Sequence, residues 1–170
     1  MTTQLLLLAA ALITQSPSQP FTSDAGRFRA TFPGSPKEQV VKVPAPPVGE
    51  IETHILVVEK GGLIYAVAYN DLPKVVVDAD PKATLEGGVQ GAVKKIEGGK
   101  LIAERDITVD GNPGKEFEAS MAGPKGVAGV YRSRIVMAKP RLYQVIHAGP
   151  KDAVMSDAGA AFLKSFQVVK

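Results

Sequence analysis

The sequence predicts one α+β domain, an antiparallel β-sheet flanked by helices on both faces in an α/β/α sandwich. The clearest observation is a hairpin, because two β-rich runs flank Gly61-Gly62, and a two-glycine link is typical of tight hairpin turns. Both faces of this hairpin are largely apolar, so both require cover. A stripe of apolar residues at helical spacing begins at Leu85 and can supply part of that cover.

Counting outward from the Gly61-Gly62 turn predicts which hairpin residues lie opposite each other. On one face the pairs are Lys60 with Leu63, Val58 with Tyr65, Leu56 with Val67 and His54 with Tyr69. On the other face the pairs are Glu59 with Ile64, Val57 with Ala66, Ile55 with Ala68 and Thr53 with Asn70. The hairpin is therefore expected at the centre of the sheet, with material packed against each side.

The N-terminal residues 1–18 have the character of a signal peptide. Leu5 to Ile13 is an apolar block too short to span a bilayer, which takes about 20 residues, and Ser16 and Ser18 suit the positions before a cleavage site. The absence of Lys or Arg from this segment is a departure from the usual pattern, so a membrane-apposed or frayed tail is the alternative. We expect an exported protein, periplasmic or extracellular and without a stable membrane span, with a linker over 19–25 and one domain over 26–170.

Two strands are expected before the hairpin and a helix after it. Phe28, Ala30 and Phe32 alternate with polar residues in the first strand, and the second covers 37–43. Residues 75–77 are expected to tuck against the core. Asp80-Pro81 is a good helix start, because Asp caps free amides and Pro is tolerated in the first turn. The glycines of this helix would let it lie close to the face that carries Ala66 and Ala68.

Four further strands and a final helix complete the predicted order. The strands cover 101–109, 115–121, 127–137 and 142–148, and the helix covers 156–164 with Phe162 as its anchor. In the second of these strands Phe117, Ala119 and Met121 are expected to point inward, with Glu116 and Glu118 outward.

Composition limits the classes of function. The 170 residues fit one domain that buries roughly two-thirds of its unfolded surface. The net charge is +3, and Lys and Arg are scattered, whereas a nucleic-acid binder usually has a dense basic stripe. Cysteine is absent, which excludes disulfides, cysteine metal sites and thiol catalysis. We expect no cofactor and no nucleic-acid partner, and a monomer.

A series of short motifs runs through residues 24 to 169. They are G-R-F from Gly26, F-P-G-S-P from Phe32, residues 65–72, I-T-V-D-G-N-P-G from Ile107, R-L-Y from Arg141 and F-L-K-S-F from Phe162. Through the order and spacing of these motifs, the chain resembles the PsbP-like domain family, in its exported bacterial branch. The resemblance implies an antiparallel sheet between helices and a non-enzymatic role, since relatives include photosystem II extrinsic subunits and a factor that binds the GTPase Ran. Their binding segments are not matched here, so neither partner is carried over.

One strand pair predicts a speculative site for an anion or a partner. A tight turn at Lys139-Pro140 pairs Met137 with Leu142 and thereby places Arg132 opposite His147. Together with Arg134, these side chains could receive a carboxylate or a phosphate. The alternative is that Glu116 and Glu118 on the neighbouring strand neutralise both arginines.

No residue is predicted to be catalytic. His54 is expected to be a hydrogen-bonded sheet residue, and no G-x-S-x-G motif is present. Asp71, Asp78 and Asp80 form the one acidic concentration, but D-x-D alone lacks the rest of a calcium loop, so no metal ligand is assigned.

Three functions follow in order of preference. The first is a non-enzymatic exported module that binds a protein partner. The second is a carrier of a small anionic ligand or a metal in the cell envelope, and the third is a hydrolase.

Overall fold

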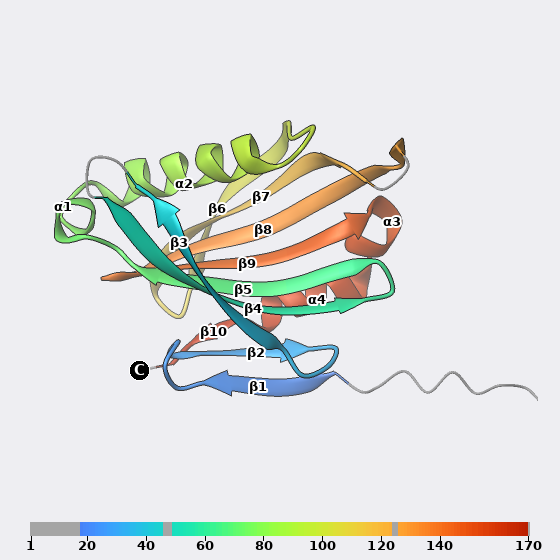
Figure 1. Cartoon of the computed structure of the whole chain (residues 1–170), viewed down its shortest axis with the longest axis horizontal. Helices are drawn as coiled ribbons and strands as arrows, with labels where there is room; N and C mark the ends of the chain where they lie inside the picture. The colour runs from blue at the N-terminus through green and yellow to red at the C-terminus, as the bar shows by residue number, and fades with distance from the viewer. Residues whose placement is uncertain (1–17, 46–48, 124–125, 170) are drawn as a thin grey trace, which may run out of the picture.

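The fold consists of two antiparallel sheets with a few helices (Figure 1). The computed structural model describes residues 18–45, 49–123 and 126–169. Seven strands form the large sheet in the order β3-β4-β5-β9-β8-β7-β6, and three form a small sheet in the order β1-β2-β10. The predicted α+β class with an antiparallel sheet is confirmed.

The elements have the following bounds. The large sheet contains β3 (Lys37–Pro44), β4 (Glu50–Lys60), β5 (Leu63–Asp71), β9 (Arg141–Pro150), β8 (Ala128–Ala138), β7 (Asn112–Ala122) and β6 (Leu101–Val109). The small sheet contains β1 (Gln19–Ser23), β2 (Phe28–Phe32) and β10 (Gln167–Val168). The helices are α1 (Lys74–Val77), α2 (Pro81–Lys95), α3 (Lys151–Val154) and α4 (Asp157–Ser165).

The central hairpin has the predicted register. Lys60 lies opposite Leu63, and the pairing continues in step to His54 opposite Tyr69. Gly61 and Gly62 have φ angles of 60° and 76°, which glycine adopts without steric cost and which a two-residue hairpin turn requires. The turn therefore determines which residues of β4 and β5 share a face.

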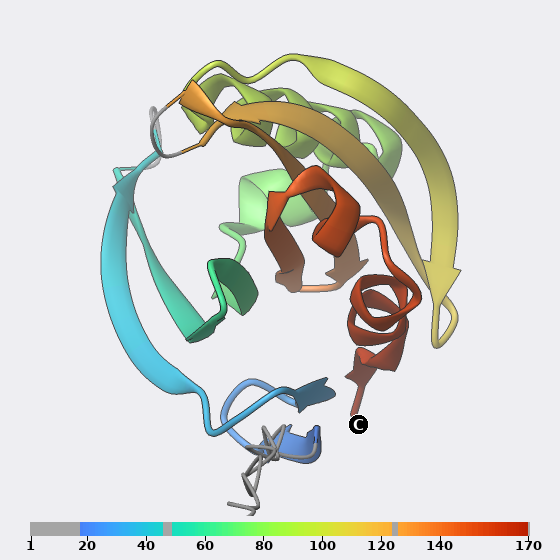
Figure 2. The ribbon, with the colours of Figure 1, turned by 90° about the vertical axis from the view of Figure 1, so that its right-hand side faces the viewer.

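The expected α/β/α sandwich, with helices flanking both faces of the sheet, is not confirmed, because the fold is dominated by strands. In the large sheet, α2 makes extensive contact only with β7 and β8. On the other face, α4 packs against β9 and against β2 of the small sheet. The small sheet covers much of that other face, and Figure 2 shows it on the side of the molecule opposite α2. Strands are about 4.8 Å apart and a helix is about 10 Å wide, so one helix covers only two or three of seven strands.

α2 begins at the predicted residue but packs against different strands from those predicted. Asp80 accepts a hydrogen bond from the backbone N–H of Lys82 at 3.1 Å, and Pro81 occupies the first turn. The expectation that the glycine edge approaches Ala66 and Ala68 is wrong, because Gly88 faces Ile135 on β8. Leu85 and Val89 pack there with a cluster of apolar side chains, namely Phe117, Ala119, Ile135 and Met137.

Two other expectations about local structure are corrected. Residues 19–25, expected as a linker, contain β1, because the Phe21 ring packs 6.3 Å from Phe28 and 5.9 Å from Phe32. The segment expected to tuck against the core is α1, in which Val75 is 65% exposed. The predicted signal peptide falls almost wholly on residues 1–17, which lie outside the described residues.

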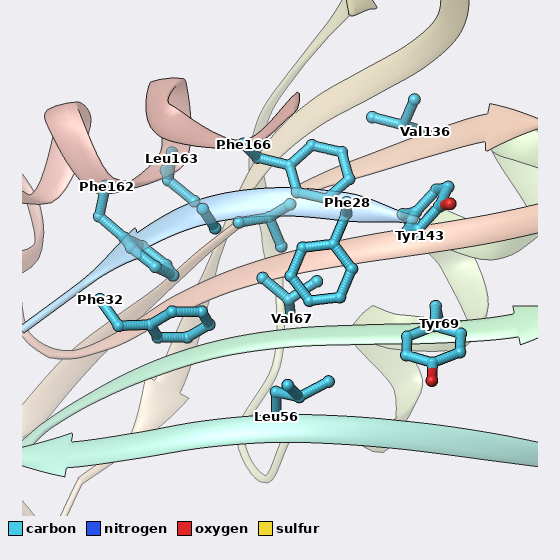
Figure 3. Packing of buried hydrophobic residues seen from close by; sticks show 12 residues of the cluster. Phe28, Phe32, Leu56, Val67, Tyr69, Val136, Tyr143, Phe162, Leu163 and Phe166 are labelled. Atoms are coloured by element: carbon cyan, nitrogen blue, oxygen red, sulfur yellow. The ribbon is translucent and has the colours of Figure 1, made fainter. Parts of the chain in front are cut away.

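The main core lies between the two sheets and α4 (Figure 3). Phe28 is fully buried at its centre, within 6.3 Å of the rings of Tyr69, Tyr143 and Phe166. The hydroxyl of Tyr143 donates to the backbone oxygen of Gly26 at 2.7 Å, so its polar end is satisfied inside the core. These contacts attach the small sheet to the large one.

Phe28→Ala should destabilise the protein by about 4 kcal/mol, because truncation leaves a cavity among four aromatic rings. Urea unfolding followed by circular dichroism measures this loss. Val75→Ala, at a side chain that is 65% exposed, is the control and should change stability by less than about 0.5 kcal/mol. Equal losses in the two variants would contradict the assignment of Phe28 to the core.

Candidate functional site

The arginines of the predicted site converge on one buried carboxylate. Glu116 accepts hydrogen bonds from Arg134 Nε at 2.6 Å, from Arg132 Nη2 at 3.0 Å and from Arg105 Nη2 at 2.8 Å. Arg132 Nε also lies 3.3 Å from a carboxylate oxygen of Glu118. The glutamates of β7 thus neutralise the arginines of β8, as the alternative interpretation predicted.

Glu116 itself was predicted to point outward, and this is wrong, because its side chain is only 5% exposed. Burial opposes its ionisation, but the hydrogen bonds from Arg105, Arg134 and Arg132 and the charge of Arg134 outweigh burial and lower its pKa to about 2. The carboxylate is thus charged at neutral pH and holds three strands together. An incoming anion would have to displace it.

His147 lies opposite Arg132, as predicted, but not on an open face. Its side chain is fully buried, stacks on Tyr65 with ring centroids 4.4 Å apart, and places Nδ1 3.0 Å from the backbone oxygen of Ile64. Burial lowers the pKa of His147, so it is neutral near pH 7. The structure therefore brings Arg132 and Arg134 together on Glu116 and keeps His147 in the core.

His54 is a hydrogen-bonded sheet residue, as predicted. Its Nδ1 lies 2.9 Å from Glu38 Oε1, and its ring stacks on Tyr69 with centroids 4.7 Å apart.

The three aspartates of the acidic segment have separate partners. Asp71 pairs with Arg141, Asp78 pairs with Lys74 at 2.7 Å, and Asp80 caps α2. Among the described residues, no three His, Cys, Asp or Glu side chains come together as a possible metal site.

Two hollows lie on the sheet face beside α2. One has a volume of about 480 Å³ and the next about 430 Å³, and they share Ile64, Met121 and Ala148 as lining residues. They therefore form one continuous depression, which we term the apolar groove. Its lining residues come from β3, β4, β5, β7, β8, β9 and the end of α2. They include Gln39, Ile55, Val57, Ala66, Ile96, Val127, Tyr131 and Ile146.

The floor and the rim of the apolar groove differ in chemistry. Ala66 and Ala148 are buried at the floor, where their small side chains leave the apolar groove deep, whereas the side chain of Ile64 is 36% exposed. Glu59, Lys95 and Glu97 supply charge at the edge. The sequence signal for this site was the second apolar face of the hairpin, which was interpreted as a face covered by a helix. α2 covers β7 and β8 instead, so β4 and β5 remain open on this side.

The two-sheet architecture with its antiparallel seven-stranded layer is a PsbP-like fold. The solution structure of cyanobacterial PsbP from Synechocystis matches with a TM-score of 0.60 at 13% identity, covering 95% of this chain and 98% of that one. This likeness concerns the fold, because the identity is low.

Two other solved structures are similar over most of their length. LpqN, involved in cell envelope biogenesis of Mycobacterium tuberculosis, has a TM-score of 0.48 at 14% identity, covering 91% of both chains. The protein PA94 from Pseudomonas aeruginosa, a putative regulator of unknown function, has a TM-score of 0.44 at 14% identity, covering 84% of this chain and 90% of that one. No protein-family model matches the sequence, and no curated sequence matches it either.

Within the part of the chain that the structure describes, no helix is both long and apolar enough to cross a membrane.

Glu116→Gln should lower stability at pH 7 by about 3 kcal/mol, because it leaves three guanidinium groups around an uncharged side chain. The lowered pKa of Glu116 means that its stabilisation is complete above pH 4.5 and is lost as the pH falls toward 2. Urea unfolding from pH 7 to pH 2 should therefore show a shallower acid dependence in the variant.

The matched control is Glu118→Gln, one pair along the same strand face, where the carboxylate makes a single 3.3 Å contact and is 22% exposed. It should cost less than about 1 kcal/mol and keep the wild-type pH profile. If both variants gave the same profile, the central position of Glu116 in the charge cluster would be wrong.

Proposed function

We propose that the protein is a non-enzymatic exported module that binds a partner protein through the apolar groove. The observation that carries this proposal is the open apolar face of the sheet, where Ile64 remains 36% exposed and Val127 60% exposed at the two hollows. Contiguous exposed apolar patches in soluble proteins commonly mark interaction sites. The PsbP-like fold agrees with a docking role, since the resembling family acts by docking on other proteins.

The dimensions of the apolar groove suit an amphipathic helix of the partner. On this face α2 already packs across β7 and β8. The next three strands, β9, β5 and β4, are left open, and Gln39 of β3 lies at the outer edge of the apolar groove. These three strands span about 10 Å from the first axis to the last, which is the width of one helix with its side chains. A second helix would therefore fit beside α2 and complete the layer.

The chemistry of the apolar groove suits the same occupant. The small side chains of Ala66 and Ala148 leave room for the apolar ridge of a helix between larger neighbours. The charged groups of Glu59, Lys95 and Glu97 at the edge could meet its polar face.

Export is supported by the N-terminal sequence. The apolar block from Leu5 to Ile13, followed by small and polar residues, matches a signal peptide. The partner would then be another protein of the periplasm or the cell surface.

A carrier of a small anion is the competing proposal. A ligand at Arg132 and Arg134 would need to break the hydrogen bonds to Glu116, and His147 would have to leave the core. Because both steps oppose binding, we favour the apolar groove.

A photoreactive side chain placed at Ile64 should crosslink to one defined helical segment of a partner in the native envelope fraction. The same group at Val40, which is 53% exposed on β3 and does not line the apolar groove, is the control and should give no such product. Mass spectrometry of the crosslinked peptides identifies the segment.

Val57→Lys places a charge in the apolar groove and should abolish the crosslink at position 64. Its unfolding midpoint tests that the fold is retained. Identical products from positions 64 and 40, or a crosslink that survives Val57→Lys in a folded protein, would contradict the proposal.

A further inference from the structure

We propose that the protein has a second binding site, which takes a phosphoryl group. It is separate from the apolar groove, with which it shares no lining residue. A pocket of about 210 Å³ lies between the β1–β2 turn, the β8–β9 turn and the last strand. Arg27, Lys139, Arg141 and Asp71 supply its charged groups. We term it the basic pocket. Figure 1 shows β10 close to the turn between β1 and β2. These two segments contribute Val168 and Arg27 to the lining of the basic pocket.

Arg141 forms the fixed wall of the basic pocket. Its guanidinium donates to both carboxylate oxygens of Asp71, at 2.6 and 2.9 Å, and to the backbone oxygen of Ala25 at 2.6 Å. It also lies over the ring of Tyr69, 4.7 Å from the centroid. Bidentate pairing and stacking hold this side chain in one place, so Asp71 is already matched by one positive charge.

Arg27 and Lys139 leave the basic pocket with an excess of positive charge. Both are exposed, and within the described ranges neither lies within ion-pair distance of a carboxylate. Among the residues that line this small cavity Asp71 is the one acidic residue, and it is matched by Arg141, so Arg27 and Lys139 add two positive charges to the lining. A guanidinium and an ammonium group facing one hollow are donors suited to an oxyanion of about two negative charges, which is the charge of a phosphoryl group near neutral pH.

The backbone of Arg27 provides an independent argument. Its φ angle is 51°, in the left-handed region that glycine and asparagine adopt readily and arginine does not. The strained conformation is held from both sides, since the N–H of Val169 donates to Arg27 O at 2.9 Å and the Tyr143 hydroxyl donates to Gly26 O at 2.7 Å. A strained residue at the rim of a pocket is typical of a functional position.

The charge of Arg27 also reaches the interior of the basic pocket. The pKa of Asp71 is lowered chiefly by its hydrogen bonds to Arg141, with a smaller contribution from the charge of Arg27. A phosphoryl group between Arg27 and Lys139 would lie beside the fixed Arg141–Asp71 pair.

The test is a thermal unfolding titration of the full chain with inorganic phosphate at low salt, against sodium chloride at matched ionic strength. Phosphate should raise the unfolding temperature and chloride should not. Absence of a phosphate-specific shift would overturn the proposal.

Three variants locate the site. Arg27→Gly removes the guanidinium and also the backbone strain, so its unfolding temperature without phosphate should rise, while its affinity for phosphate falls at least tenfold. Lys139→Gln should weaken phosphate at least tenfold as well. Arg29→Ala, at an exposed arginine of β2 that does not line the basic pocket, should bind phosphate like the wild type. Retention of the phosphate shift in both Arg27→Gly and Lys139→Gln would place the ion elsewhere and overturn the proposal.

Two further ligands distinguish the source of the phosphoryl group. Glycerol 3-phosphate tests a soluble phosphomonoester, and vesicles of phosphatidylcholine with or without phosphatidic acid test a lipid headgroup. Binding that requires the phosphoryl group and is lost in Arg27→Gly supports the site in either arm. Equal binding to vesicles with and without phosphatidic acid, together with no response to either soluble phosphate, would count against it.

Discussion

The structure depends on one constraint, that a broad antiparallel sheet with apolar side chains on both faces must be covered. On one face the small sheet and α4 meet this requirement through the aromatic cluster around Phe28 and Tyr143. On the other face α2 covers β7 and β8, and nothing in the described chain lies over β4 and β5 to the same extent. The apolar groove is the part of this apolar face that α2 leaves uncovered, and the proposed docking function follows from that exposure.

Charge is organised around the same sheet. Glu116 at the centre of its cluster binds arginines from β6 and β8, so one carboxylate ties three neighbouring strands together. The lysine next to it, Lys115, points to the other face and pairs with Glu104 at 2.6 Å and Asp106 at 2.9 Å. Hydrogen bonds to these carboxylates raise the pKa of Lys115, which therefore stays charged. Most of the charges that could attract a ligand on β6, β7 and β8 are thus already paired within the sheet.

The apolar groove and the basic pocket use different properties of the molecule. The apolar groove arises from missing cover and suits a large apolar surface, for which shape and burial determine binding. The basic pocket arises where chain segments far apart in the sequence meet, and its charges suit a small anion. Because they share no lining residue, an occupant of one need not exclude an occupant of the other.

The sequence by itself determined the local pairing. The Gly61-Gly62 turn fixed the register of β4 and β5, the turn at Lys139-Pro140 placed Arg132 opposite His147, and Asp80 set the start of α2. These features follow from turn geometry and from the two-residue period of a strand, which act within a few residues. Only the tertiary structure decided that α2 covers β8 rather than Ala66 and that Glu116 is buried among three arginines. It also decided that Arg27 and Lys139 line the same pocket. Those outcomes depend on the order of strands in the sheet and on contacts between distant segments, which no local rule contains.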